Sequence, residues 1–189
     1  MQLTQFDSSQ PVFSRSDKLF KTAFDYLITI PALLLLLPLL TIIAITIKLE
    51  SSGPVLHRRR VFGCNGQVFT AYKFRTVYFD MPGQQRTIVG QCLRRTGLDE
   101  LPKLFNVLNQ TMSLVGPRFL SYSDLLRYGT AHRAWLVMKP GLTGLWQING
   151  RCYPNISKRI QLDRQYIENW SLWLDCKILL STLILANPK

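Results

Sequence analysis

The sequence is poor in the side chains that most often build metal sites and acid–base catalytic centres. Its 189 residues include two histidines, His57 and His132, and four cysteines that form no C-x-x-C pair. No zinc site is legible in such a sequence, and a catalytic triad that depends on histidine is poorly supported. We expect the cysteines to be reduced packing residues. Neither a Walker loop nor a dinucleotide fingerprint occurs at its required spacing.

Acidic residues are also scarce. Aspartate and glutamate total 11 against 23 lysines and arginines, which gives a formal net charge of +12. Such a balance fits an anionic partner, namely nucleic acid, anionic lipid or a phosphorylated substrate. The 47% hydrophobic content argues against disorder. The length suits one domain of ordinary size, without a repeat or a second catalytic domain.

One long stretch, residues 26–47, has no charged side chain. At about 1.5 Å per residue it is just long enough to cross a hydrocarbon core of about 30 Å. We therefore predict a membrane-inserted helix over residues 18–50. A polar N-terminal tail, residues 1–17, precedes it, and a cytoplasmic domain, residues 51–189, follows. A cleaved signal peptide fits less well, since no small-x-small cleavage site follows the run.

Two prolines, Pro31 and Pro38, interrupt this run, and basic residues flank it on both sides. The positive-inside tendency would leave both ends in the cytoplasm. Because proline frees a carbonyl and bends a helix, a re-entrant hairpin near Pro38 is physically available. A helix that spans the bilayer is the alternative.

A β-hairpin is predicted over residues 52–76, where two β-branched and aromatic runs flank Gly63-Cys64-Asn65-Gly66. Lys73 and Arg75 alternate with other residues in the second run, so they should share one face of its strand. We expect the arginine run at 58–60 to contact lipid headgroups, with a solvated basic face as the alternative.

Two adjacent acids, Asp99 and Glu100, stand at the head of a predicted central helix. A preceding helix, residues 87–96, should stop at Gly97. Pro102 is tolerated only in a first helical turn, so the next helix should begin near Asp99 as its N-cap. Unpaired backbone N–H groups there favour an ionised carboxylate and attract phosphate. Acids are nevertheless ordinary in any first helical turn, so the pair alone does not establish a catalytic site.

Two arginines follow turns that suit phosphate binding. Gly116-Pro117-Arg118 can hold a guanidinium against a phosphate in fixed geometry. A glycine-punctuated loop, residues 139–151, ends in Arg151, which would add a second bidentate contact. Without further context, either turn is an ordinary surface feature.

Three more helices are predicted, over residues 123–138, 157–170 and 171–186. The last is rich in leucine and isoleucine and carries Trp173 and Lys177. This composition suits a membrane interface and burial in the domain core about equally. The expected fold class is α+β, mostly helical: a membrane-associated domain with an N-terminal re-entrant or spanning hydrophobic helix and a short β-hairpin.

The motifs around the acidic pair resemble those of a known family. Leu-Asp-Glu-Leu-Pro at 98–102, Asn-Val-Leu at 106–108 and Met-Ser-Leu-Val-Gly-Pro-Arg at 112–118, in this order, resemble the bacterial sugar transferases, which are polyprenyl-phosphate phosphoglycosyl transferases. The resemblance runs from about residue 18 to the C-terminus. It implies an enzyme on the cytoplasmic face of the bacterial inner membrane that transfers a sugar 1-phosphate from a UDP-sugar to undecaprenyl phosphate. The product would start an exopolysaccharide, capsule or O-antigen repeat.

The resemblance also implies residue roles. Asp99 would be the nucleophile that carries a covalent phosphosugar, assisted by Glu100, and both acids would be ligands of Mg²⁺. The phosphate-binding cations would be Lys73, Arg94, Arg118 and Arg151, although Arg94 also suits the C-terminal end of a helix dipole. The partners would be the UDP-sugar, polyprenyl phosphate and membrane lipids. A homodimer is left open, and no nucleic acid is expected.

Several positions depart from the family pattern. Gln110-Thr111 stands where the family commonly has Gly-Asp, Phe119 where it commonly has proline, and Leu37 where it often has serine. The departures at Gln110-Thr111 and Phe119 favour one alternative, a catalytically weak membrane scaffold of a polysaccharide assembly, whereas Leu37 removes a hydroxyl that could satisfy backbone groups freed by Pro38 in a re-entrant hairpin. The net charge favours another, a membrane-tethered nucleic-acid binder.

Overall fold

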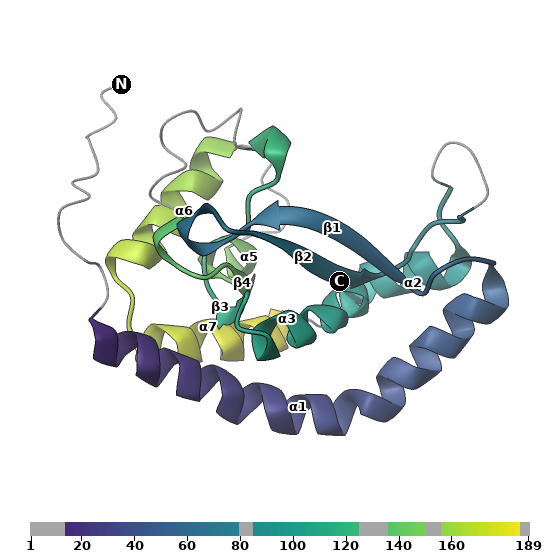
Figure 1. Ribbon diagram of the computed structural model, residues 1–189, viewed down its shortest axis with the longest axis horizontal. Coiled ribbons are helices and arrows are strands. Elements are labelled where there is room, and N and C mark those ends of the chain that lie inside the picture. Colours follow the sequence, from purple (N-terminus) through teal and green to yellow (C-terminus); the bar gives the residue numbers. More distant parts are fainter. Residues whose placement is uncertain (1–13, 80–84, 125–135, 150–155, 186–189) are drawn as a thin grey trace.

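The longest element is the helix α1 (Arg15–Glu50), which begins at a capping box formed by Ser14 and Asp17. It runs through Pro31 and Pro38 as one continuous helix that bows, with both ends turned towards the rest of the chain (Figure 1). The helix bend expected near Pro38 is therefore gradual (Figure 1). At this bend the Thr41 hydroxyl donates to the Leu37 carbonyl at 2.9 Å, so a hydroxyl bonds the backbone here although Leu37 replaces serine. The computed structural model describes residues 14–79, 85–124, 136–149 and 156–185.

The two faces of α1 differ sharply in exposure. One stripe is buried against the domain: Lys21, Asp25, Thr29, Leu33, Leu40, Ile43 and Ile47. The opposite face exposes large aliphatic side chains, among them Leu27, Leu34, Leu35, Ile42 and Ile45. By length and composition α1 is a helix that could cross a membrane. A continuous exposed apolar face of this kind is costly in water and typical of a surface that contacts lipid.

Both ends of α1 are fixed to the same domain. Near its start, Lys21 pairs with Asp175 of α7 (Leu172–Leu185) at 2.5 Å. At its other end, Glu50 accepts hydrogen bonds from the backbone of Ile88 and Val89, in the first turn of α2 (Ile88–Thr96). Both ends of the apolar helix are consequently held on one domain.

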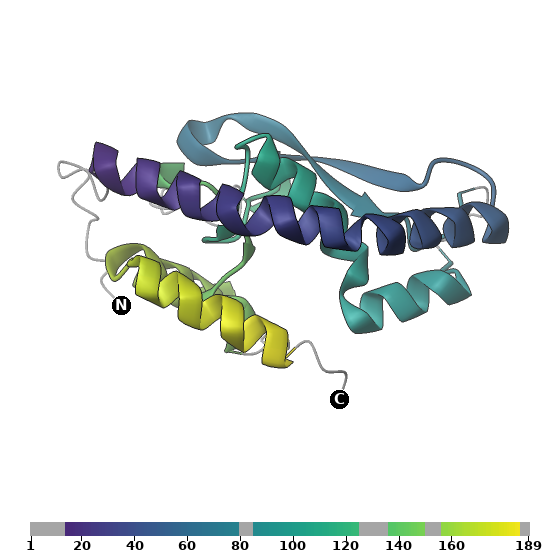
Figure 2. The same cartoon turned by 90° about the horizontal axis from the view of Figure 1, so that it is seen from below.

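The predicted hairpin is confirmed. β1 (Leu56–Phe62) and β2 (Val68–Phe74) pair antiparallel around the short 3₁₀ turn η1 (Cys64–Gly66). Seen from below, the hairpin lies on one side of α1 and α7 on the other (Figure 2). Arg75 follows the last residue of β2 and contacts other groups than Lys73 does. Its guanidinium donates to the carbonyls of Ser51 and Ser52 just after α1. One of the two predicted strand-face cations therefore caps a helix.

Asn106 closes the free edge of β2. This residue lies in α3 (Leu104–Leu108), and its side chain accepts from the Tyr72 N–H at 3.1 Å and donates to the Thr70 carbonyl at 2.7 Å. The amide thus bonds to β2 as a neighbouring strand would. Since the 3₁₀ helix η2 (Leu98–Lys103) directly precedes α3, this contact also places η2 beside β2.

A second, parallel strand pair was not predicted. β3 (Ser113–Val115) pairs with β4 (Gly141–Thr143), and the short helix α5 (Leu145–Ile148) follows. A Cβ added at Gly141 would lie 2.1 Å from the backbone nitrogen of Gly116, so only glycine permits this approach. Because β4 and α5 both fall within residues 139–151, the segment predicted to be a loop contains a strand and a helix.

The two C-terminal helices are confirmed as α6 (Ile156–Glu168) and α7. Buried Tyr166 joins them, since its hydroxyl donates to Asp175 at 2.7 Å. Burial raises the pKa of Tyr166 well above its ordinary value, and the negative charge of Asp175 raises it further. Most of the helix predicted over residues 123–138 lies outside the described residues.

Gln110 occupies a left-handed backbone conformation, with φ of 58°. This geometry explains why the family commonly has glycine here, because a side chain at such a φ costs about 1 kcal/mol or more. The Gln110 side chain offsets part of this cost, since its oxygen accepts a hydrogen bond from Lys139 and its nitrogen donates to the Val107 carbonyl.

We predict that Asn106→Ala destabilises the domain by about 2–4 kcal/mol, because it leaves two half-buried strand groups without their side-chain partner and opens a cavity at a buried position. The matched control is Asn109→Ala, at an exposed asparagine just after α3, which should change stability by under about 0.5 kcal/mol. Urea unfolding in detergent micelles measures both. Equal stability of the two variants would show that the strand edge does not depend on Asn106.

Candidate active site

The acidic pair lies in the tight turn between α2 and α3. α2 ends at Gly97, which takes the left-handed conformation with φ of 76°, and η2 begins at once. Asp99 was predicted to be an N-cap. That prediction is wrong in detail, because Gly97 holds the capping position and Asp99 is the second residue of η2. Pro102 lies inside this 3₁₀ helix. The helix predicted to begin near Asp99 therefore starts as a tighter turn, in which each hydrogen bond spans three residues instead of four.

Asp99 forms an ion pair with Lys73 of the hairpin. Its Oδ2 lies 2.5 Å from the lysine Nζ. The aspartate is 4% exposed as a residue, whereas the Lys73 side chain keeps 29% of its surface in solvent. The buried carboxylate is therefore held by a cation that can still be reached from solvent.

Glu100 forms a second ion pair, with Lys103 one turn later in η2, at 3.1 Å. Burial is the largest single influence on the pKa of Glu100 and would raise it, but the Lys103 ammonium, together with the charges of Lys73 and Arg118, lowers that pKa below its ordinary value. Burial lowers the pKa of Lys103 in turn, against the opposing effect of Glu100. Neighbouring acids thus have different partners, which is what different chemical roles require.

Arg118 faces this pair from the turn after β3. Its positive charge contributes, with that of Lys73, to the lowered pKa of Glu100. The guanidinium stacks between two rings, 5.5 Å from the centre of Phe119 and 4.9 Å from that of Trp146. Stacking of this kind fixes the plane of the guanidinium, which bidentate phosphate binding needs.

Three residues of the site were missed from the sequence. Lys103 stands three positions after Glu100. This spacing allows two side chains on a helix to pair, so the sequence could have predicted the contact. Trp146 and Arg159 were not, because Arg159 reaches the Trp146 ring, 5.0 Å away, from α6. Only the tertiary fold brings these segments together.

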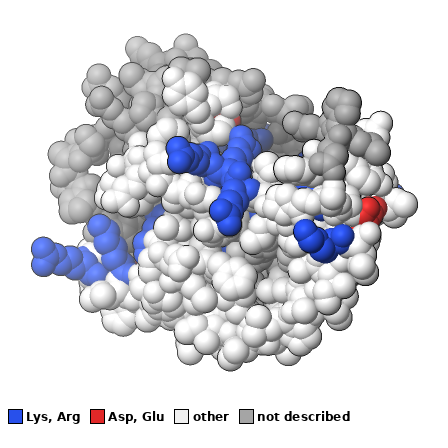
Figure 3. Space-filling model, turned by 45° about the vertical axis from the view of Figure 1, so that its right-hand side comes forward, with Lys and Arg blue, Asp and Glu red and all other residues white. Residues whose placement is uncertain are grey.

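The structure does not bring every predicted cation to the acids. Arg94 is exposed in the last turn of α2 and, within the described ranges, pairs with neither Asp99 nor Glu100. Its position suits the helix-dipole alternative. Arg151 lies outside the described residues. On the face shown in Figure 3, lysine and arginine side chains far exceed acidic ones among the described residues.

The acidic pair is not a closed metal cage. Across residues 14–79, 85–124, 136–149 and 156–185, no group of three or more histidine, cysteine, aspartate or glutamate side chains gathers to hold a metal. Two carboxylates fit Mg²⁺ in another way, because this ion often takes one or two carboxylates and completes its shell with substrate phosphates and water.

We predict that Lys103→Met raises the pKa of Glu100, since burial remains while the opposing ammonium is lost. In the wild-type chain the stabilisation from Glu100 is complete above its unfolded-state pKa and is lost as the pH falls through its lower folded-state pKa. A ¹³C NMR titration with labelled glutamate measures the shift. Exposed Glu168, paired with Arg164, is the internal reference, and an unmoved Glu100 signal in the variant would refute the pairing.

Comparison with known proteins identifies the family of the chain. The model of the family described as "Bacterial sugar transferase" matches residues 16–187. The exopolysaccharide production protein ExoY of Rhizobium meliloti is 37% identical over 188 residues, which cover 86% of this chain and 83% of that protein. Family-typical motifs therefore extend over nearly the whole chain.

Two longer proteins are also similar. The undecaprenyl-phosphate glucose phosphotransferase of Komagataeibacter xylinus is 39% identical over 90% of this chain but only 36% of its own length. The UDP-glucose:undecaprenyl-phosphate glucose-1-phosphate transferase of Escherichia coli is 36% identical over 88% of this chain and 40% of its own length. This chain thus spans well under half of these two relatives. Because the family model covers all but the extreme ends, the chain belongs to the bacterial sugar transferase family.

Proposed function

We propose that the chain transfers a sugar 1-phosphate from a UDP-sugar to a polyprenyl phosphate, with Asp99 as the covalent carrier. The observation that carries this proposal is the buried Asp99 carboxylate held at 2.5 Å from Lys73, within the family's own motif. The names of the relatives support the acceptor, since two of them act on undecaprenyl phosphate. The product would begin an exopolysaccharide or related repeat unit.

The reaction has two displacements at phosphorus. A carboxylate oxygen of Asp99 attacks the sugar-proximal phosphorus, a new P–O bond forms, and the bond to the bridging oxygen breaks so that UMP leaves. A phosphate oxygen of the polyprenyl phosphate then attacks the same phosphorus, and the bond to Asp99 breaks. Aspartate is regenerated and the sugar ends on a lipid diphosphate. Splitting the transfer suits one aqueous and one membrane-bound substrate.

The cations around Asp99 would neutralise the charge that develops on the transferred group. Lys73, which pairs with the carboxylate, would move onto a phosphate oxygen when Asp99 attacks. Arg118, which stacks on two rings, would make a bidentate contact. Mg²⁺ held by the substrate diphosphate together with Asp99 and Glu100 would supply further neutralisation. Glu100, bound to Lys103, would assist as ligand or positioning group.

The membrane supplies the acceptor in this proposal. The exposed apolar face of α1 would enter the lipid as a re-entrant helix. α7 exposes Trp173, Leu180, Leu183 and Ile184, and a tryptophan beside aliphatic side chains suits the headgroup boundary. The domain would then lie on the cytoplasmic face, where UDP-sugars are available.

We predict that the wild-type chain, given its UDP-sugar and Mg²⁺ but no lipid acceptor, releases at most one equivalent of UMP. Asp99→Asn should lower the rate of this UMP release by at least about a thousandfold, because the nucleophile is lost. Glu100→Gln should slow the release but keep its stoichiometry. A panel of UDP-sugars assayed by chromatography, with circular dichroism as the folding control, measures these effects. UMP release that requires polyprenyl phosphate would instead indicate direct displacement.

A second prediction concerns Arg118. Arg118→Lys keeps the charge but loses the planar fork, so kcat/KM should fall by about tenfold or more. The control is Arg58→Lys, at an exposed arginine of β1, which should leave turnover unchanged. Steady-state UMP release with polyprenyl phosphate present compares them. A wild-type rate for Arg118→Lys would mean that this arginine only tunes surface charge.

A third prediction concerns membrane topology. Both ends of α1 contact one domain, so single cysteines at exposed positions 16 and 52 should be accessible from the same, cytoplasmic side. The test is labelling with an impermeant maleimide, in intact cells and in inverted vesicles, of chains whose four native cysteines are replaced by serine. Labelling of one site from outside intact cells would establish a spanning helix instead.

A further inference from the structure

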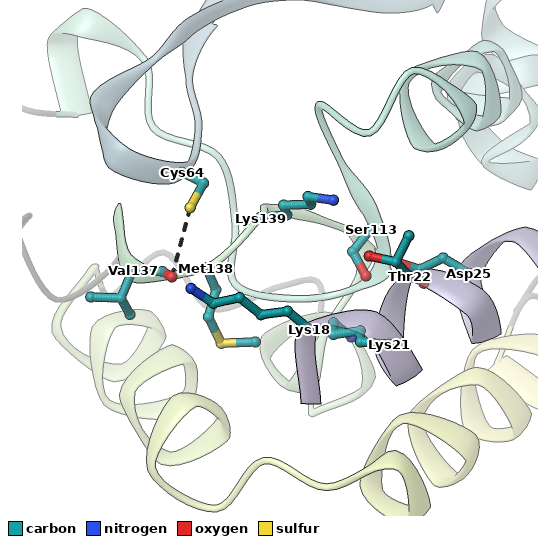
Figure 4. A pocket seen from close by; sticks show the side chains of 9 residues that line it. All are labelled: Lys18, Lys21, Thr22, Asp25, Cys64, Ser113, Val137, Met138 and Lys139. Atoms are coloured by element: carbon teal, nitrogen blue, oxygen red, sulfur yellow. Dashed lines mark hydrogen bonds between the residues drawn. The ribbon is translucent and has the colours of Figure 1, made fainter. Parts of the chain in front are cut away.

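A cavity distinct from the acidic site lies beside the start of α1. Its lining includes Lys18, Lys21, Lys139, Ser113 and Cys64, and it encloses about 180 Å³. We call these five residues and the space between them the lysine pocket. In Figure 4 the three lysine chains approach the same space from α1 and from the segment before β4. The volume far exceeds what one water molecule needs.

The lysine pocket is far from Asp99. Cys64 lies in the hairpin turn, whereas Lys73 lies near the other end of β2. At about 3.3 Å per strand residue, the two are about 20 Å apart along the hairpin. A phosphate bound in the lysine pocket therefore could not be the phosphoryl group that reacts at Asp99.

The charge of the pocket favours an anion. Three lysines line it, against one carboxylate, that of Asp25. This carboxylate already accepts a hydrogen bond from the Leu114 N–H at 3.1 Å. Lys21 is committed to Asp175, so Lys18 and Lys139 supply the excess positive charge. An anion is the ligand that this arrangement would stabilise.

Two features describe how the cations lie around the pocket. Lys139 lines it, and its ammonium donates a hydrogen bond to the side chain of Gln110, a neutral partner that leaves its positive charge uncompensated. Burial raises the pKa of the Cys64 thiol, and the charges of Lys18 and Lys139 act against that rise. Both ammonium groups therefore lie close enough to Cys64 to influence it.

We propose that the lysine pocket binds the phosphate group of a phosphate ester. Lys18 and Lys139 would contact the phosphate oxygens, and the fully buried Ser113 side chain would line the base of the site. The walls formed by Val137, Met138 and the lysine stems would pack against the apolar part of the ester. The phosphate comes either from an anionic lipid headgroup, since Lys18 and Lys21 precede the apolar run of α1, or from a soluble phosphate ester. This proposal does not depend on the chemistry at Asp99.

Cys64 provides a direct reporter, because a ligand in the lysine pocket would block its thiol. Alkylation by N-ethylmaleimide would be followed peptide by peptide in the full chain, with exposed Cys92 as internal control. One arm adds inorganic phosphate to the chain in neutral detergent, at ionic strength matched with chloride. The other compares nanodiscs of phosphatidylcholine with and without phosphatidylglycerol.

We expect selective protection of Cys64, by about tenfold when the ligand reaches ten times its Kd. Protection by phosphate identifies a soluble source, and protection only by phosphatidylglycerol identifies a lipid. Lys18→Gln should remove most of the protection and Lys48→Gln, at the other exposed end of α1, should keep it; each ratio is taken within one variant. The proposal is overturned if neither arm protects Cys64, if Cys92 slows equally, or if Lys18→Gln retains full protection.

Discussion

The amide of Asn106 bonded along the edge of β2 is the contact on which the acidic site depends. A two-stranded hairpin leaves one edge of β2 open, and the Asn106 side chain satisfies a donor and an acceptor there, at Tyr72 and Thr70. Because η2 and α3 are consecutive, the same contact sets Asp99 against Lys73. A residue of the Asn-Val-Leu motif therefore acts by placing the nucleophile of the proposed reaction rather than by touching substrate.

Local sequence signals predicted those parts of the fold that depend on short-range interactions. Alternation around Gly63–Gly66 and the stop at Gly97 indicated the hairpin and α2 correctly. Contacts between distant segments were not legible. The parallel pair of β3 and β4 joins strands of three residues each, too short for a periodic signal. The placement of Asp99 within a 3₁₀ helix, and the stack of Arg118 and Arg159 on Trp146, likewise depend on tertiary packing.

α1 links the site to the lipid in this account. Its buried stripe packs on the domain, and Tyr26 donates to the Leu108 carbonyl at the end of α3 at 3.1 Å. The helix that would enter the bilayer thus contacts the element that follows the acidic pair. An acceptor in the membrane and a donor from water would meet at one carboxylate, which favours a covalent carrier over simultaneous binding of both substrates.

The most direct test of the central claim is the location of the phosphosugar on the chain. Protein incubated with its UDP-sugar and Mg²⁺, without acceptor, would be quenched in acid, digested and fragmented in a mass spectrometer. The account predicts a sugar-phosphate mass on Asp99, which disappears when polyprenyl phosphate is added before the quench. An adduct on Glu100, or an unmodified peptide despite UMP release, would contradict it.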